Sequence, residues 1–462
     1  MAKKRLFGTD GVRGKANATL TIDLAMKLGT AVGDWIRSRS AMPAAGEYAR
    51  PFVVIGRDTR LSCDMLESAL TAGLTSRGVD VQCIGTAPTP AVSHCVSTMM
   101  ASAGFVISAS HNPYYDNGIK LFGPDGRKLP DIVEDEIERF IDSPCTDPVS
   151  PDHIGTIVRS ARPVESYVQH VCATVSAPSE PHPLKGLSIV LDCANGAAYE
   201  VAPAIFEQLG ADVALLHASP DGLNINVECG STHPDTMAQT VRALKATAGL
   251  AFDGDADRVI LSDENGNIIN GDRMLAIIGK HLYSQGLLYG KVVVATIMSN
   301  VGLEKALEPE GIRLHRTDVG DRYVSAAMDG LHASIGGEQS GHILLPHLTP
   351  TGDGIVTGLQ VLKVMKEHQK SLSELAAVVQ DYPQELKSVT VTDRVSWTTD
   401  EDIQSAIIES IEELGKPEWL SVRASGTEPL IRVMAQGTDE AVVSRVVGRL
   451  IGLVTEKYGV VV

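Results

Sequence analysis

Short hydrophobic runs rich in valine, isoleucine and leucine recur along most of the chain. Each is followed by a polar loop, an amphipathic segment and a second hydrophobic run. The pattern occurs three times, over residues 51–85, 187–217 and 291–320. β-Branched runs on both sides of a helix are typical of parallel strands in a sheet that helices cover on both faces. We therefore predict an internal repeat of three β-α-β units.

A glycine stands between the helix and the second strand in each copy: Gly78, Gly210 and Gly311. Helices commonly end at glycine, because glycine adopts positive φ without a steric penalty. We predict positive φ at all three glycines.

The last part of the chain has a different pattern. From about Ser373 it predicts a helix, then alternating strands within 387–393 and 419–437, then a C-terminal helix over 439–459. This order is typical of an α+β module. Proline-rich residues 143–153, the region around Arg258 and polar residues 368–374 are the expected boundaries. They divide the chain into domains 1–155, 156–257, 258–371 and 372–462.

Charge and cysteine content indicate which classes of partner the protein can bind and in which cellular compartment it works. The 462 residues carry 40 basic and 57 acidic side chains, a net charge of −17, which opposes binding to nucleic acid and to anionic membranes. A local basic pocket can still bind a small anion, because salt screens the diffuse field over about 10 Å. The seven cysteines are scattered without a C-x-x-C pair, so we expect reduced thiols. With no signal-peptide core and no run of roughly 18 apolar residues, we expect a cytoplasmic protein.

The first candidate site follows the hydrophobic run 104–107, where Ser108, Ser110 and His111 come next. Open α/β sheets bind ligands at the carboxyl ends of their strands. An Asn-Pro turn with incidental polar residues is the alternative. A catalytic triad built on the serine and histidine is disfavoured, because adjacent residues in an extended segment point to opposite sides and no G-x-S-x-G elbow is present.

The second candidate is the alternation of Asp253, Asp255 and Asp257 after a hydrophobic run. In an extended loop, period-two spacing places three carboxylates on one side, where they suit Mg²⁺. An EF-hand is excluded, because Arg258 occupies the sixth position, where that loop needs glycine. Three solvated aspartates in a turn are the alternative.

The third candidate is the segment 422–433, in which two arginines flank a turn of small residues. Glycine lets backbone N–H groups converge, and arginines bind phosphate bidentately, so the segment predicts an anion site. A structural hairpin with surface arginines is the alternative. The residues of this candidate are Arg423, Ser425, Gly426, Thr427 and Arg432.

Two weaker candidates are glycine-rich. In residues 336–343, Glu338, Ser340 and His342 alternate, so one face of an extended loop would offer partners for sugar hydroxyls. Residues 8–14 place Arg13 between glycines. Each is equally compatible with an ordinary glycine turn.

The candidates fit one chemistry when they are taken together. A serine loop, a cation site, a polyol-reading loop and a phosphate site stand one in each predicted domain. Transfer of a phosphoryl group on a phosphosugar would use all four. A phosphate site separate from the cation site implies a ligand that bears, at some stage, two phosphoryl positions. Such a ligand is typical of a mutase, which moves a phosphoryl group from one position of a sugar to another.

Five motifs carry a resemblance to a known family. They are GTDGVRG, SASHNP, DGDADR, GGEQSGH and RASGTEPLIR, in this order over essentially the whole chain. They resemble the α-D-phosphohexomutases. The resemblance implies an α/β protein with three related α/β domains and a fourth α+β domain of TATA-binding-protein-like fold around a central cleft.

The resemblance also implies roles for the residues. Ser110 would carry the phosphoryl group, Ser108 would support it, and Mg²⁺ would be held by Asp253, Asp255, Asp257 and the phosphate on Ser110. Lys120 and Arg258 would assist the transfer. Glu338 and Ser340, with His342, would contact the sugar. Arg423, Ser425, Gly426, Thr427 and Arg432 would hold the phosphate that is not reacting. Candidates for general acid and base are Lys120, Arg13, His111 and His342.

The implied reaction converts glucosamine 6-phosphate to glucosamine 1-phosphate through glucosamine 1,6-bisphosphate, as an isomerase that feeds UDP-N-acetylglucosamine and peptidoglycan synthesis. We expect a phosphosugar partner, no nucleic acid, no membrane and a homodimer. Alternatives are a phosphomannomutase or phosphoglucomutase of the same family, a Mg²⁺-dependent sugar-phosphate phosphatase, and a non-catalytic sugar-phosphate sensor.

Overall fold

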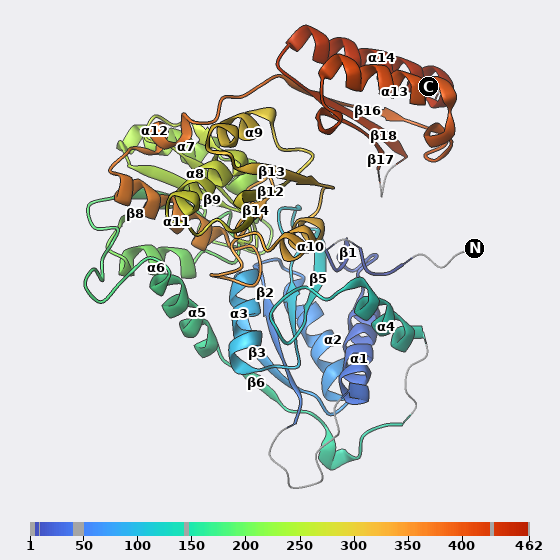
Figure 1. Ribbon diagram of the computed structural model, residues 1–462. Coiled ribbons are helices and arrows are strands. Elements are labelled where there is room, and N and C mark those ends of the chain that lie inside the picture. Colours follow the sequence, from blue (N-terminus) through green and yellow to red (C-terminus); the bar gives the residue numbers. More distant parts are fainter. Residues whose placement is uncertain (1–4, 9, 40–49, 143–146, 426–428, 461–462) are drawn as a thin grey trace. The chain divides into compact units, whose positions relative to one another are not determined.

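The computed structural model describes residues 5–8, 10–39, 50–142, 147–425 and 429–460 (Figure 1). The chain forms two compact units, residues 1–281 with 340–376, and residues 282–339 with 377–462. Among the described residues, no helix is both long enough and apolar enough to cross a membrane.

The first unit begins with a mixed six-stranded sheet in the order β1-β5-β4-β2-β3-β6. Strands β4, β2, β3 and β6 are parallel, whereas β5 runs antiparallel to both of its neighbours. The strands are β1 (Val12–Lys15), β2 (Phe52–Arg57), β3 (Asp80–Thr86), β4 (Ala103–Ile107), β5 (Asp116–Phe122) and β6 (Ile157–Arg159).

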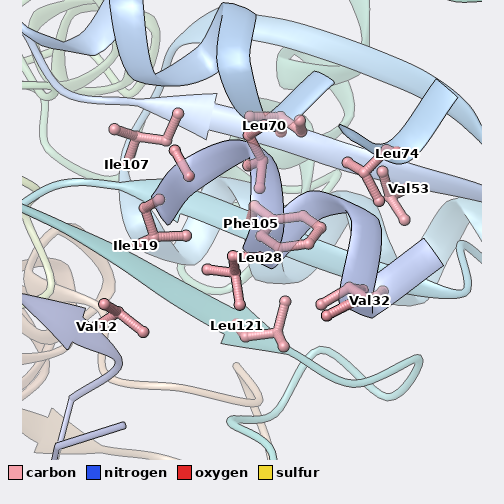
Figure 2. Close-up of a cluster of buried hydrophobic side chains, with 14 of the residues drawn as sticks. Val12, Leu28, Val32, Val53, Leu70, Leu74, Phe105, Ile107, Ile119 and Leu121 are labelled. Carbon is pink, nitrogen blue, oxygen red and sulfur yellow. The ribbon is translucent and has the colours of Figure 1, made fainter. Parts of the chain in front are cut away.

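Helices cover both faces of this sheet (Figure 1). Val53 and Phe105 point into a core on one face of the sheet, where they pack with Leu28 of α1 and Leu70 of α2 (Figure 2). The opposite face packs on α3, so closely that a Cβ on Gly104 would lie 2.3 Å from Val96 Cγ2. The helices are α1 (Ile22–Arg39), α2 (Cys63–Thr75), α3 (Thr89–Met99) and α4 (Asp131–Asp142).

The second sheet has five strands in the order β11-β10-β9-β7-β8. Strands β9, β7 and β8 are parallel, and β10 and β11 add antiparallel hairpins. The strands are β7 (Ser188–Asp192), β8 (Asp212–Leu216), β9 (Ala248–Phe252), β10 (Val259–Ser262) and β11 (Ile268–Ile269). Helices α6 (Val201–Gln208) and α7 (Asp235–Leu244) pack on it, whereas α5 (Arg162–Ala173) contacts α3, β3 and α6.

Further elements complete the first unit. Asp353 caps α11, since its side chain accepts a hydrogen bond from the Val356 N–H. The elements are α8 (Gly271–Ser284), whose end runs into the second unit, β15 (Ile343–Leu344), α11 (Gly354–His368) and α12 (Leu372–Ala376).

The second unit contains two groups of strands. The parallel strands β13, β12 and β14 lie side by side in that order, with α9 and α10. A three-stranded antiparallel sheet, β16-β18-β17, packs on α13 and α14 through Val433, Val447 and Leu450. The elements are β12 (Val292–Thr296), α9 (Val301–Leu307), β13 (Arg313–Thr317), α10 (Asp321–Leu331), β14 (Gly336–Gly337), β16 (Gln384–Thr390), α13 (Glu401–Leu414), β17 (Leu420–Ala424), β18 (Leu430–Gln436) and α14 (Glu440–Tyr458).

The predicted β-α-β repeat is confirmed: β2-α2-β3, β7-α6-β8 and β12-α9-β13 each join two parallel neighbours. The φ angles of Gly78, Gly210 and Gly311 are 77°, 92° and 68°. The helix expected from Ser373 is only the short α12, and α13 was not predicted.

The domain boundaries predicted at 155/156, 257/258 and 371/372 remain predictions. Strand β6 lies after the boundary predicted at 155/156 but pairs with β3, which lies before it. Strands β10 and β11 lie after the boundary predicted at 257/258 but belong to the same sheet as β9, which lies before it.

Candidate active site

The predicted serine loop begins where β4 ends. Ser110 is 2% exposed and has a φ of 54°, the left-handed region that non-glycine residues rarely occupy. Its backbone N–H donates to Ser108 Oγ over 2.9 Å, and Ser108 Oγ donates to Asp58 Oδ2 over 2.6 Å. Ser108 therefore links the unusual backbone at Ser110 to the end of the neighbouring parallel strand β2.

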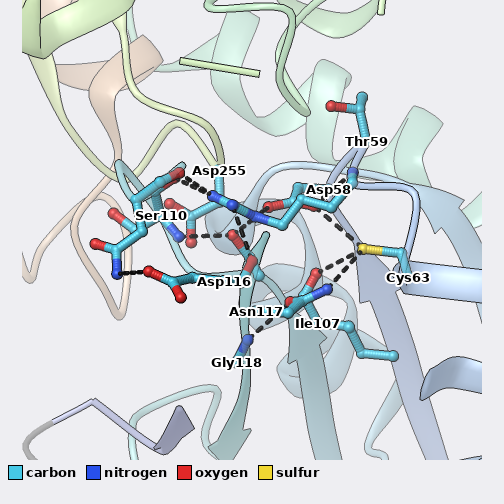
Figure 3. Close-up of polar contacts among 12 residues, drawn as sticks. Asp58, Thr59, Cys63, Ile107, Ser110, Asp116, Asn117, Gly118 and Asp255 are labelled. Carbon is cyan, nitrogen blue, oxygen red and sulfur yellow. Dashed lines mark hydrogen bonds and ion pairs between the residues drawn. The ribbon is translucent and has the colours of Figure 1, made fainter. Parts of the chain in front are cut away.

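Asp58 is paired with Arg60, whose guanidinium is buried and fixes the serine loop. Figure 3 shows the polar contacts around Asp58, Ser110 and Asp116. Arg60 Nε donates to Asp58 Oδ2 over 2.8 Å, and Nη2 donates to the carbonyls of Ser110 and Asn112, each over 2.8 Å. The carbonyl of Asp116 accepts a further bond from Nη1 over 3.0 Å. Nη1 also donates to the carbonyl of Pro113, so one side chain binds four backbone carbonyls between Ser110 and Asp116.

Residues in the loops of the second sheet also contact the serine loop. Asn226 Nδ2 donates to the carbonyl of Ser110 over 2.8 Å and to that of Asn112 over 3.1 Å. The Ser110 hydroxyl donates to Asp253 Oδ2 over 2.5 Å. Ser110 therefore lies directly against the predicted cation site.

The expectation that Ser110 and His111 point to opposite sides is wrong. Ser110 Oγ lies 3.4 Å from His111 Nδ1, because the left-handed backbone at Ser110 breaks the alternation of an extended segment. Burial and the positive charges of Arg258 and Arg13 lower the pKa of His111 to about 4. The imidazole is therefore neutral at pH 7 and can accept a proton.

The three aspartates meet, although not for the predicted reason. Carboxylate oxygens of Asp253, Asp255 and Asp257 all lie within 4.8 Å of one another. The segment that carries them is a turn with a φ of 57° at Ala256, not an extended loop. The carboxylates converge because the turn between β9 and β10 bends around them.

Lys120, on β5, lies among these carboxylates. Its Nζ is 2.7 Å from Asp255 Oδ2, 3.1 Å from Asp257 Oδ2 and 3.3 Å from Asp10 Oδ2. Burial opposes the charge of Lys120, but the three carboxylates outweigh it and raise the pKa well above its usual value. Lys120 is therefore a permanent cation near pH 7.

The aspartates themselves differ in their electrostatics. Burial, together with the negative charges of Asp257 and Asp255, raises the pKa of Asp253 well above its usual range. Burial acts in the same direction on Asp257, but Lys120 and His342 outweigh it and hold the pKa of Asp257 well below its usual range. Asp253, which touches Ser110, thus has less cationic compensation from side chains than Asp257 has.

The cluster fits a divalent cation. The Oδ1 atom of Asp255 is buried and has no hydrogen-bond donor among the described residues. Thr89 holds the other oxygen, since its hydroxyl donates to Asp255 Oδ2 over 2.5 Å. An all-oxygen set with a buried oxygen left open is the chemistry that Mg²⁺ prefers.

The other predicted residues of the first unit surround this cluster. Arg258 donates its backbone N–H to Asp253 Oδ1 over 3.2 Å, and its Nε lies 3.9 Å from Asp257 Oδ1. His342 is 3% exposed by its side chain, and its Nδ1 lies 3.5 Å from Asp257 Oδ1. Arg13 forms an ion pair with Asp10.

Residues 336–343 do not form the extended loop that was predicted. Residues 339 and 340 form a turn, and Gly341 after them has a φ of 90°, so the segment does not alternate as an extended strand does; Glu338 is buried and Ser340 is exposed. Glu338 accepts a hydrogen bond from the Gly320 N–H over 3.1 Å within the second unit. Sugar binding by this loop remains a prediction.

The predicted phosphate site lies in the second unit, where Arg423 on β17 pairs in register with Arg432 on β18. Burial and the positive charge of Arg432 lower the pKa of Arg423. The Ser425 carbonyl accepts a hydrogen bond from Arg394 Nη1 over 3.0 Å. Two adjacent guanidinium groups favour an anion between them. Gly426 and Thr427 lie outside the described residues.

Comparisons with known proteins agree with this geometry. Models of the phosphoglucomutase/phosphomannomutase family match in chain order: domain I over residues 4–145, domain II over 165–266, domain III over 270–382 and the C-terminal domain over 386–453. The chain is 48% identical over 453 residues to the phosphoglucosamine mutase of Desulforudis audaxviator, covering 98% of each chain.

The chain belongs to the phosphohexomutase family.

Two further phosphohexomutase relatives extend the comparison. The phosphoglucosamine mutase of Moorella thermoacetica is 49% identical over 438 residues, 94% of this chain and 96% of that one. A phosphoglucomutase/phosphomannomutase family protein from Burkholderia thailandensis has a similar fold, with a TM-score of 0.79 at 22% identity, over 99% of this chain and 98% of that one. The four-domain α/β architecture expected from the resemblance is confirmed.

Several residues of the phosphohexomutase site escaped the sequence interpretation. Asp58 and Arg60 directly follow a strand, as Ser108 and Ser110 do, so the same signal could have found them. Thr89 and Asn226 carry no local signal, because their partners lie more than a hundred residues away. Asp10 stands inside the motif GTDGVRG, in which only Arg13 was singled out.

Proposed function

We propose that this phosphohexomutase interconverts glucosamine 6-phosphate and glucosamine 1-phosphate, with Ser110 carrying the transferred phosphoryl group. The observation that carries the proposal is the position of the Ser110 hydroxyl, 2.5 Å from Asp253 and inside the cluster of three aspartates. The amino-sugar substrate is supported by the phosphoglucosamine mutases to which the chain is 48% and 49% identical. The enzyme is an isomerase.

The reaction has two phosphoryl transfers. A free hydroxyl of the substrate attacks the phosphorus on Ser110, the bond from phosphorus to Ser110 Oγ breaks, and glucosamine 1,6-bisphosphate forms. The hydroxyl loses a proton and Ser110 Oγ gains one. The second transfer is the reverse, from the other end of the bisphosphate back to Ser110.

Cationic side chains stabilise the charge that develops on the transferring phosphoryl group. Lys120 is buried and positively charged at the cluster, and Arg258 adjoins it, so both can attract the equatorial oxygens of a loose transition state. Asp253, Asp255 and Asp257, with the phosphate on Ser110, would hold Mg²⁺. When bound, Mg²⁺ supplies positive charge to the same oxygens.

Proton transfer is assigned to His111. His111 Nδ1 lies 3.4 Å from Ser110 Oγ, within reach of the proton that passes between the attacking hydroxyl and Ser110. Lys120 is disfavoured as a base, because its neighbouring carboxylates keep it protonated. For Arg13 and His342 we propose positioning roles instead, since Arg13 pairs with Asp10 and His342 with Asp257.

The remaining roles follow the family resemblance. Arg423 and Arg432, with Ser425, Gly426 and Thr427, bind the phosphate that is not reacting, and Glu338 and Ser340 contact sugar hydroxyls. We place the reaction in the cytoplasm, upstream of UDP-N-acetylglucosamine and peptidoglycan synthesis. A homodimer and the absence of nucleic-acid and membrane partners remain expectations.

Phosphorus NMR tests the proposal. The purified protein, phosphorylated on Ser110 and supplied with Mg²⁺, is incubated separately with the 6-phosphates of glucosamine, glucose and mannose. We expect glucosamine 1-phosphate to form fastest, without inorganic phosphate. Faster conversion of the glucose or mannose compound would indicate a phosphoglucomutase or phosphomannomutase instead. Release of inorganic phosphate alone would indicate a phosphatase.

Replacing Ser110 by alanine tests the role of the hydroxyl. Because no phosphoserine can form, we expect kcat to fall by about 10⁴-fold or more while the phosphosugar still binds. Turnover is measured by NMR and binding by calorimetry. Retained turnover would exclude Ser110 as the carrier, and a wild-type protein that binds without turnover would be a sensor.

A further inference from the structure

A second group of metal-binding side chains lies outside the phosphoserine cluster, at the carboxyl ends of β7 and β8. Asp192 is the last residue of β7, His217 follows β8, and Cys229 precedes the short 3-10 helix at Gly230–Thr232. Donor atoms of the three side chains all lie within 4.8 Å of one another. Asp192 and Cys229 are fully buried. Nothing in the phosphoryl-transfer reaction uses them.

The spacing of the group fits a tetrahedral ion. His217 Nδ1 lies 3.0 Å from Asp192 Oδ2. Nitrogen and oxygen ligands about 2.0 Å from a tetrahedral zinc ion are separated by about 3.3 Å. A shift of a few tenths of an ångström would therefore bring these two atoms to zinc. The Cys229 sulfur, within 4.8 Å of both, is the third ligand.

Backbone groups hold the carboxylate in place without any metal. Asp192 Oδ1 accepts a hydrogen bond from the Ala194 N–H over 2.9 Å, and Oδ2 accepts one from the Gly230 N–H over 3.0 Å. Gly230 has a φ of 71°, and a Cβ there would lie 2.5 Å from the Phe252 carbonyl oxygen. The close packing of Gly230 fixes the neighbouring Cys229, and outer hydrogen bonds of this kind orient metal ligands.

The donor set distinguishes this group from the aspartate cluster. One sulfur, one nitrogen and one oxygen suit zinc, whereas three carboxylates suit a hard cation such as Mg²⁺. The His217 side chain is 29% exposed, which gives an ion and a water ligand a route to the group.

We propose that Asp192, His217 and Cys229 bind one Zn²⁺ ion, with water as the fourth ligand, at a site separate from the cation site beside Ser110. Binding displaces the thiol proton of Cys229 and, where present, the second proton of His217. Affinity for zinc therefore falls as the pH falls.

The site has a structural consequence for the enzyme. Cys229 follows Asn226 by three residues, and Asn226 donates to the carbonyls of Ser110 and Asn112. Zinc would tie the segment that contains both residues to β7 and β8. We therefore expect bound zinc to stabilise the fold without entering the reaction.

Cobalt spectroscopy on the full-length protein tests the proposal. Metal-stripped protein, kept reduced with a non-thiol reductant and saturated with Mg²⁺, is titrated with Co²⁺. A cobalt ion bound by Cys229 gives a thiolate-to-metal charge-transfer band in the near ultraviolet and intense tetrahedral visible bands, which an all-oxygen site cannot give. We expect both at one equivalent of Co²⁺, and their loss when Zn²⁺ is added.

Matched variants locate the signal. Cys229→Ser should abolish the charge-transfer band, whereas Cys193→Ser, a buried thiol that points to the Ala198 carbonyl, should keep it. His217→Gln, at a partly exposed position, should weaken zinc binding by about tenfold or more. Zinc should raise the Tm of the wild type and of Cys193→Ser only. A band that is absent from the wild type, or that persists in Cys229→Ser, would mean an ordinary His–Asp pair beside a core thiol and would overturn the proposal.

Discussion

The aspartate cluster around Ser110 and the arginine pair of β17 and β18 handle charge in opposite ways. In the cluster, buried carboxylates are matched by Lys120, which contacts Asp10, Asp255 and Asp257. In the pair, Arg423 and Arg432 carry charge of the same sign at one register position of a hairpin.

The difference fits the proposed roles of the two sites. Atoms that exchange a phosphoryl group must be held in fixed positions, and the proposed transfer site has contacts from both sheets of the first unit. A phosphate that is only held needs positively charged donors, and under the proposal a single hairpin supplies two of them. Substitutions in the cluster should therefore lower kcat, and substitutions in the pair should raise KM.

The largest effect is expected from Asp255→Asn. The change removes one negative charge from the cation site while Thr89 can still bond to the side chain, so kcat should fall by about 100- to 1000-fold. Steady-state kinetics measures the loss, and Mn²⁺ binding followed by electron paramagnetic resonance should weaken in parallel. Asp263→Asn, a buried aspartate in the next turn, is the control and should keep Mn²⁺ affinity. Unchanged Mn²⁺ affinity in Asp255→Asn would contradict the assignment.

Arg60→Lys should have the next largest effect. A lysine cannot reach the carbonyls of Ser110, Asn112 and Asp116 together, so the serine loop loses its support. We expect kcat to fall by about 10- to 100-fold and stability by about 3 kcal/mol, with little change in KM.

Arg57→Lys is the matched control for Arg60. Arg57 pairs with Asp64, whose side chain is 78% exposed, and with Glu67, whose side chain is 11% exposed. A lysine keeps the positive charge beside both carboxylates, so Arg57→Lys should cost at most about 1 kcal/mol. Thermal unfolding and kinetics of both variants separate the two roles of Arg60. A lower Tm with wild-type kcat would mean that Arg60 supports the fold and does not position Ser110.

Arg423→Gln should act on binding. Loss of one charged fork from the arginine pair should raise KM for the phosphosugar by about 10- to 30-fold and change kcat much less. Arg445→Gln on α14, which breaks an exposed pair with Glu413, is the control and should leave KM unchanged. Wild-type KM in Arg423→Gln would remove the contrast between the two sites.

The smallest effect concerns acid stability away from both sites. Burial, with the charge of His170, lowers the pKa of His94 from its usual 6.5 to about 4. The folded protein binds that proton more weakly than the unfolded chain, so this stability is present above pH 6.5 and is lost as the pH falls towards 4. At pH 5 the loss is about 2 kcal/mol. The Tm of His94→Gln should therefore fall less than that of the wild type between pH 7 and 5, and equal falls would exclude His94 as a cause.

Local pattern predicted the parts of the fold and site that depend on local sequence. Alternation and glycine positions gave the three β-α-β units, and the residues after β4 and β9 placed Ser110 and the aspartates at strand ends. The arginine pair was found in the same way, because a hairpin brings Arg423 and Arg432 together without help from the rest of the chain.

The parts that were missed depend on contacts between distant segments or on single backbone angles. Thr89 meets Asp255 only because two sheets pack together, and no local spacing records that. His111 lies near Ser110 Oγ only because Ser110 is left-handed, an angle that serine rarely adopts. The predictions that assumed an extended backbone were wrong at Ser110 and at Ala256, because both residues have positive φ.

The left-handed backbone of Ser110 also limits how the enzyme can be improved. A non-glycine residue held in this conformation costs about 1 kcal/mol or more, and glycine would remove that cost. Under the proposed mechanism, position 110 therefore trades stability for activity: the substitution that relaxes the backbone also removes the proposed phosphoryl carrier. Selection of variants by thermal stability alone would therefore favour glycine at position 110. The selected protein would be stable but, under the proposed mechanism, inactive.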